Sequence, residues 1–180
     1  MSDLLFKNPR FDVLQSALYH AERRKFFDFL NRLVNFIVIL LGAGAAAKWA
    51  QLVHLDDVWI ELAIVVFATA QLVFDFGGSA RVHEFLQKRL YEFLAGIEAD
   101  GNADDAAMQK WSSKLVLLTA DEPMTMRALD AIAYNKALDA VVSGEEKYNY
   151  RQDVSFWQKR LRHFVAFQAV DFFPKRKSRS

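Results

Sequence analysis

The sequence predicts an all-α protein: a two-helix transmembrane hairpin with a long N-terminal helix extension, followed by a cytoplasmic helical bundle. The main observation is a pair of apolar runs joined by a short polar link, LVNFIVILLGAGAAA (Leu33–Ala47) and VWIELAIVVFATAQLVF (Val58–Phe74). A second observation is that apolar residues elsewhere recur every three or four positions, which is typical of amphipathic helices. The third is that cations flank the pair of runs on both outer sides.

The two runs reach membrane-spanning length when their limits are set at about residues 33–50 and 58–76. A helix needs roughly 20 mostly apolar residues to cross about 30 Å of hydrocarbon. Trp49 and Trp59 then lie at the same end of the hairpin. Because tryptophan is favoured at the level of the lipid headgroups, we interpret both residues as interface anchors. Runs of this length also occur as buried core helices, so that alternative stays open.

Charge on the flanks gives the hairpin an orientation. Four cations precede the first run and form what we call the basic collar: Arg23, Arg24, Lys25 and Arg32. Three more follow the second run, at Arg81, Lys88 and Arg89, whereas the link contributes only Lys48. Because positive residues favour the cytoplasmic side, we expect both termini in the cytoplasm.

Small and polar residues within the runs are candidates for helix packing or for lining a pore. The spacing of Gly42 and Ala46, with Gly44 between them, matches the small-xxx-small pattern that lets membrane helices approach closely. Asn35 and Gln71 are polar residues at bilayer depth, and such groups face a partner or water. The simpler interpretation of these two amides is one inter-helix hydrogen bond, worth about 0.6 kcal/mol.

Two sequence motifs favour other functions, but each lacks its context. FIVILLGAGAAA also fits a strand followed by the dinucleotide-binding pattern G-x-G-x-x-A, yet downstream of Gly78 the spacing is helical and offers no further strands. Asp75-Phe76-Gly77 matches the metal-binding triplet of protein kinases without any other kinase motif. We expect Gly77-Gly78 to end the second membrane helix.

The remaining chain predicts further helices. They begin at about Phe11, which makes the first membrane helix the upper half of one long helix, and continue from Ser79 to Gly101. Others are expected at about 106–118, from Pro123 to Gly144, and at about 151–173. The domain boundaries follow as a two-transmembrane region at 1–100, a cytoplasmic helical region at 101–174 and a basic tail at 175–180.

Composition excludes several functional classes. The net charge of +1 argues against a dedicated nucleic-acid binder, and the absence of cysteine excludes disulfides and thiolate metal sites. The four histidines are isolated in the sequence, and neither H-E-x-x-H nor G-x-S-x-G occurs. We therefore expect no enzyme activity, no cofactor and no bound metal.

The layout resembles a known family. A basic, aromatic helix (YHAERRKFFDFLNR) runs into a membrane segment, a second segment follows closely, and then comes a helix with His and Arg (ARVHEFLQKRLYEFLAGIE). This arrangement, over roughly Phe11 to Glu98, is similar to the SLATT-type two-transmembrane effectors of bacterial conflict and antiphage systems. The resemblance implies a homo-oligomeric effector that permeabilises the bacterial inner membrane, triggered by a separate nucleotide-sensing or nucleotidyltransferase partner protein.

The physical argument for such a role is independent of the family. Two spans cannot enclose an aqueous channel, so a pore requires several copies and self-association is predicted. Two alternatives share most of the features: a membrane-anchored helical adaptor without pore activity, and a soluble α-helical interaction protein. The bilayer and a second copy of the chain are the partners predicted first.

Overall fold

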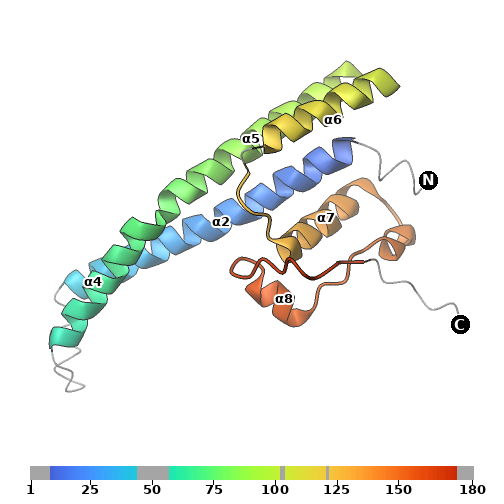
Figure 1. The fold of residues 1–180 in the computed structure, drawn as a ribbon. Coiled ribbons are helices and arrows are strands. Elements are labelled where there is room, and N and C mark those ends of the chain that lie inside the picture. Colours follow the sequence, from blue (N-terminus) through green and yellow to red (C-terminus); the bar gives the residue numbers. More distant parts are fainter. Residues whose placement is uncertain (1–8, 44–56, 102–103, 121, 174–180) are drawn as a thin grey trace, which may run out of the picture. The chain divides into compact units, whose positions relative to one another are not determined.

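The structure, a computed structural model, describes residues 9–43, 57–101, 104–120 and 122–173. Within those ranges the regular elements are helices and no strand occurs, which confirms the predicted all-α class (Figure 1). In chain order they are α2 (Pro9–Gly42), α4 (Asp57–Phe74), α5 (Phe76–Asp100), α6 (Asp105–Thr119), α7 (Arg127–Val141), the 3-10 helix η1 (Glu145–Asn149) and α8 (Phe156–Leu161).

The chain divides into two compact units. The hairpin unit is Arg23–His83, and the bundle unit combines Met1–Glu22 with Glu84–Ser180. Both α2 and α5 contribute residues to each unit, so the division does not follow the domain boundary predicted at residue 100. The two units are described separately below.

The core of the bundle unit is built around the first part of α2. One side of this segment packs on α5 and α6 through Val13, Ala17, Leu90, Phe93, Ile97 and Trp111. Another side meets α7, where Phe11 contacts Tyr134, Ala137 and Leu138, and Tyr19 contacts Leu129 and Ala133. The N-terminal extension is thus a central element of the bundle, and not only a segment that precedes the first predicted span.

The hairpin unit contains the rest of α2 and all of α4. The prediction that the first apolar run continues a longer helix is confirmed, because α2 is unbroken from Pro9 to Gly42. The predicted hairpin tip and residues 44–50 of the first span lie outside the described residues. At about 1.5 Å per residue, the 18 residues of α4 extend about 27 Å, close to the thickness of bilayer hydrocarbon.

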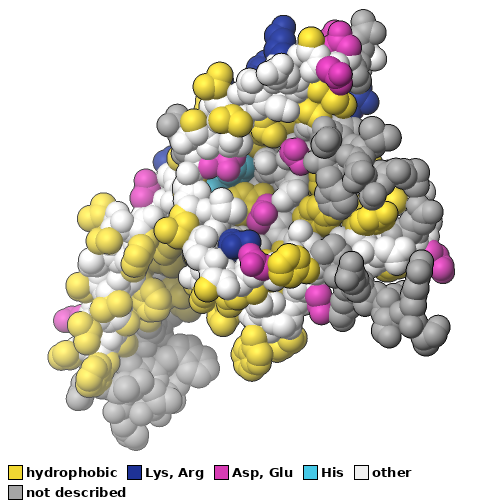
Figure 2. Space-filling model, turned by 45° about the vertical axis from the view of Figure 1, so that its right-hand side comes forward, with side chains coloured by type: hydrophobic (Ala, Val, Ile, Leu, Met, Phe, Trp, Pro, Cys, Tyr) yellow, Lys and Arg dark blue, Asp and Glu magenta, His cyan; other side chains and the backbone are white. Residues whose placement is uncertain are grey.

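The apolar side chains of the hairpin unit are largely exposed. Figure 2 shows hydrophobic side chains over much of the surface of this unit. Among the described residues, one stretch, Val58–Asp100, which contains α4, is long and apolar enough to cross a membrane; its apolar window has a mean hydropathy of 1.8 and no buried residue. This supports the second predicted span, while the spanning of the first run stays a prediction.

The end of α4 differs from the prediction. The helix ends at Phe74, and Gly77-Gly78 lie in the first turn of α5, so they do not terminate the predicted membrane helix. Asp75 adopts a positive φ of 37°, and its Oδ1 accepts a hydrogen bond from the Gly78 backbone N–H at 2.9 Å. Asp75 therefore caps the next helix, and a Cβ at Gly78 would overlap the Asp75 carboxylate, which would have to move away from this capping position.

The helix predicted from Pro123 begins only at Arg127. The Met126 backbone N–H, which precedes it, donates to the hydroxyl oxygen of Tyr19 at 3.0 Å. The bounds of α6 agree with the helix predicted at about 106–118, and Asp104 caps its start by accepting from the Ala107 backbone N–H at 2.7 Å.

The long helix predicted at 151–173 is wrong, because only Phe156–Leu161 is helical there. The later residues of this segment bond to α7: the Arg127 backbone N–H donates to the Ala166 carbonyl at 3.1 Å. Phe167, at φ 51°, and Phe172 pack on a buried cluster of Ala128, Ala131 and Val154. Tertiary contacts thus replace the helical hydrogen bonds that the spacing predicted.

Candidate functional site

Three polar side chains meet inside the hairpin unit. Gln71 Nε2 donates to Asn31 Oδ1, and Asn35 Nδ2 donates to the same oxygen at 3.4 Å. The structure therefore brings the predicted Asn35 and Gln71 together through Asn31, a residue the sequence analysis did not single out. Its signal was the i, i+4 spacing to Asn35 along one helix face.

The depth of this cluster differs from the expectation. Because α4 ends at Phe74, Gln71 lies in the last turn of the helix and not at its middle. Gly77 lies close to the cluster, since a Cβ there would be 3.5 Å from Asn31 Oδ1. Gln71 Oε1 is buried and has no hydrogen-bond partner within the described chain, so one acceptor of the cluster is left open.

The small-residue candidates divide between described and undescribed parts. Gly42 is exposed, and a Cβ added there would meet no atom of the described residues within 4 Å, so this glycine makes no close contact with the described part of α4. Gly44, Ala46 and Trp49 lie outside the described residues. Trp59, the other predicted interface anchor, is exposed in the first turn of α4.

The basic collar is not a uniform charged surface. Arg23 is buried, and its guanidinium carbon lies 4.5 Å from the centroid of the Phe27 ring, a cation–π contact. Phe27 in turn stacks on the buried ring of His83 at 5.6 Å, with 8° between the ring planes.

The other members of the collar lie on the surface. Arg24 pairs with Asp28 at 3.6 Å along the helix, while Lys25 and Arg32 are exposed. In the basic collar, Arg23 therefore packs against aromatic rings, whereas the other three cations face solvent.

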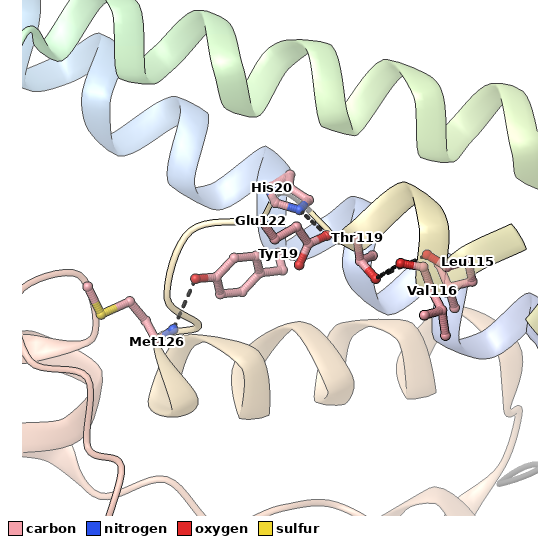
Figure 3. A network of polar contacts seen from close by, with 7 residues as sticks. All are labelled: Tyr19, His20, Leu115, Val116, Thr119, Glu122 and Met126. Atoms are coloured by element: carbon pink, nitrogen blue, oxygen red, sulfur yellow. Dashed lines mark hydrogen bonds and ion pairs between the residues drawn. The ribbon is translucent and has the colours of Figure 1, made fainter. Parts of the chain in front are cut away.

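A polar network links α2 to the segment between α6 and α7 in the bundle unit (Figure 3). His20 is fully buried, and its Nε2 lies 2.8 Å from Glu122 Oε1. Its neighbour Tyr19 accepts from the Met126 backbone N–H, and Thr119 Oγ1 donates to the Leu115 carbonyl at 3.0 Å. Two successive side chains of α2 therefore fix both ends of the segment that leads into α7.

A second carboxylate lies beside this network. Gln15 Nε2 donates to Asp130 Oδ1 at 2.7 Å, and Asp130 and Glu122 both line a cavity of about 300 Å³. Burial raises the pKa of Asp130 above its ordinary value and the charge of Glu122 adds to this, while the Gln15 hydrogen bond and Arg127 oppose it. The sequence could not indicate that Asp130 pairs with Gln15, because 115 positions separate them.

The arrangement in the bundle unit has a clear structural consequence. The side chains of Gln15, Tyr19 and His20 each bond to a residue more than 100 positions away, so these hydrogen bonds fix tertiary structure. Among the described residues no group of three or more His, Cys, Asp or Glu side chains could hold a metal ion. The expectations of no enzyme activity and no cofactor stay predictions.

Comparisons with protein-family models, curated proteins and solved structures found no significant match. The resemblance to SLATT-type effectors therefore stays a prediction based on layout.

Proposed function

We propose that this protein is a membrane effector of a bacterial conflict or antiphage response, whose hairpin unit inserts into the inner membrane, self-associates and permeabilises the bilayer. Both termini lie in the cytoplasm in this proposal, and a separate nucleotide-sensing or nucleotidyltransferase partner supplies the trigger. The proposed membrane insertion rests on one observation. The apolar window of the stretch that includes α4 contains no buried residue.

Exposed apolar side chains are costly in water and favourable in lipid. Soluble monomers rarely expose contiguous apolar patches larger than a few hundred Å². The α4 helix exposes Val58, Trp59, Leu62, Val65, Val66, Leu72, Val73 and Phe74. A bilayer would cover these side chains without any protein partner.

Self-association is supported by the open faces of α2. Asn35 is exposed on an otherwise apolar part of this helix, beside the exposed Phe36 and near Ile39. An amide in hydrocarbon gains from a partner helix. The space beside Gly42 would admit a helix from a second copy, because no described residue of the same chain lies within 4 Å of a Cβ added there.

The test combines membrane fractionation with a voltage-sensitive dye during controlled expression in a bacterium. We expect the protein in the membrane fraction together with depolarisation. Recovery in the soluble fraction would contradict every membrane role, and membrane-bound protein that never depolarises the cell would favour the adaptor.

The packing surface is tested by Gly42→Leu. Since no described residue lies within 4 Å of a Cβ at this site, we expect the change to leave the described fold unaffected and to act on contacts between copies. We expect it to abolish depolarisation, whereas the matched change Gly96→Leu, at an equally open helical glycine of the bundle unit, should have no effect. Equal depolarisation in both variants would exclude Gly42 from the interface.

A membrane-anchored adaptor is the second candidate. The observation favouring it is the exposed apolar pair Val116 and Leu117 on α6 of the bundle unit, a surface that a protein partner would cover. An adaptor would share the membrane location but cause no depolarisation.

A further inference from the structure

A cavity of the bundle unit lies between α7 and the segment that leads from η1 into α8. Its volume is about 500 Å³, within the range of small-molecule sites in proteins. The polar and aromatic side chains that line it are Asn135, Lys136, Tyr148, Arg151, Asp153 and Lys159. The polar network of Figure 3 uses none of these residues.

The wall of the cavity is fixed by two reciprocal hydrogen bonds. Asn135 Nδ2 donates to the Gln152 carbonyl at 2.9 Å, and Asn135 Oδ1 accepts from the Gln152 backbone N–H at 2.8 Å. Two residues further, Val154 is buried against Ala128 and Ala131. The chain next to Arg151 is therefore held on α7, and the cavity is preformed.

The charge of the lining is positive. Three cations, Lys136, Arg151 and Lys159, face one carboxylate, Asp153. The excess of positive charge in this lining favours an anionic ligand.

These cations keep hydrogen-bond donors available. Lys136 pairs with Glu22 at 2.8 Å, and Arg151 uses Nη1 for Asp139 at 2.9 Å, which leaves further N–H groups on each side chain. Lys159 makes no ion pair within the part of the chain that the structure describes.

We propose that this cavity binds a small phosphate monoester that carries a planar ring. Arg151 offers the planar fork of donors that suits a phosphate, and Lys159 adds a point charge. Tyr148, which is exposed at the cavity, provides an aromatic face for the ring of the ligand. The proposal does not rest on the proposed membrane function, because every lining residue belongs to the bundle unit.

Isothermal titration calorimetry of the full chain in neutral detergent micelles tests the proposal. The probes are phenyl phosphate, adenosine 5′-monophosphate, inorganic phosphate and uncharged adenosine. We expect both esters to bind with a Kd below about 1 mM, and adenosine and inorganic phosphate to bind at least about tenfold more weakly. Absence of binding by both esters, or equal binding of adenosine, would overturn the proposal.

Lys159→Gln locates the site. We expect this change to raise the Kd of both esters about fivefold or more, by loss of one charged contact. Lys110→Gln, a matched change on the exposed face of α6, should leave the Kd unchanged. Because Lys159 has no ion pair to lose in the described structure, its variant should keep the wild-type thermal unfolding midpoint; an unchanged Kd in a folded variant would also overturn the assignment.

Discussion

The hairpin unit and the bundle unit contain similar kinds of apolar residue, but these residues are mostly exposed in the hairpin unit and often buried in the bundle unit. In the bundle unit Leu90, Ile97, Leu129 and Leu138 are each less than 2% exposed. Among the described residues of the hairpin unit, the buried apolar side chains are Val34 and Ala80, whereas most of α4 is open. The difference supports the proposal that the two units have different surroundings: water would drive the packing of the bundle, and lipid would surround the hairpin.

The largest expected effect comes from shortening a buried leucine of the bundle. Leu90→Ala should lower the free energy of unfolding by about 2–5 kcal/mol, because the side chain is 1% exposed and leaves a cavity. Leu72→Ala, at a residue that is 82% exposed in the hairpin unit, serves as the matched control and should change it by less than about 0.5 kcal/mol. Urea unfolding in detergent measures both, and equal losses would contradict the contrast between the units.

A charge placed on the exposed face of α4 sharpens the same contrast. Val65→Arg should reduce membrane insertion by about 2.5–3.5 kcal/mol, since arginine is costly at the centre of a membrane helix. Val116→Arg, at a similarly exposed position on α6, should leave insertion unchanged. The measured quantity is the fraction of protein that sediments with membranes; equal fractions for the two variants would indicate that lipid does not cover α4.

The polar network of the bundle should contribute a smaller amount. Glu122→Ala leaves the fully buried His20 without this partner and should cost about 1–3 kcal/mol of unfolding free energy. Glu92→Ala, which removes the exposed Lys88–Glu92 pair, should cost less than about 0.5 kcal/mol. Thermal unfolding of both variants provides the comparison, and a loss confined to Glu92→Ala would refute the assigned role of the network.

The smallest effect is a pH dependence with opposite signs at two carboxylates of the bundle. Burial raises the pKa of Asp130 above its ordinary 3.8, so the folded state binds more protons than the unfolded state just above that pH. This contribution is present below pH 3.8 and is lost as the pH rises through the raised pKa. Asp130→Asn should therefore remove part of a decline in stability with rising pH.

Asp139 provides the opposite sign. Slight burial raises its pKa, but hydrogen bonds and charge from Lys147 and Arg151 outweigh that effect and hold it below the ordinary value. Its contribution is present above pH 3.8 and is lost as the pH falls through the lowered pKa. Urea unfolding from pH 3 to 7 measures both slopes; the same sign of change for Asp130→Asn and Asp139→Asn would contradict the assignment.

The sequence predicted the features that depend on local spacing. The all-α class, the unbroken α2 and the approximate bounds of α6 followed from periodicity. The structure at 151–173 could not be predicted this way, because contacts of Phe167 and Phe172 with α7 override its helical spacing. The end of α4 was missed because Asp75, and not the glycines, sets it through a hydrogen bond to Gly78.

The candidate site was predicted only in part, because its residues meet through contacts between positions far apart in the sequence. Asn35 and Gln71 stood out as polar residues in apolar runs, but Asn31, which joins them, lies at the boundary of the first run. The cavity of the bundle unit combines residues from α7, η1 and α8, and no spacing in the sequence indicates that these residues meet.

The central claim, that lipid covers α4 while water surrounds the bundle unit, is tested most directly by cysteine accessibility. The chain has no cysteine, so Val65→Cys and Val116→Cys each introduce a single reactive thiol. In inside-out membrane vesicles treated with a membrane-impermeant maleimide, we expect rapid labelling at residue 116 and labelling at residue 65 only after denaturation. Rapid labelling at both residues would contradict the claim.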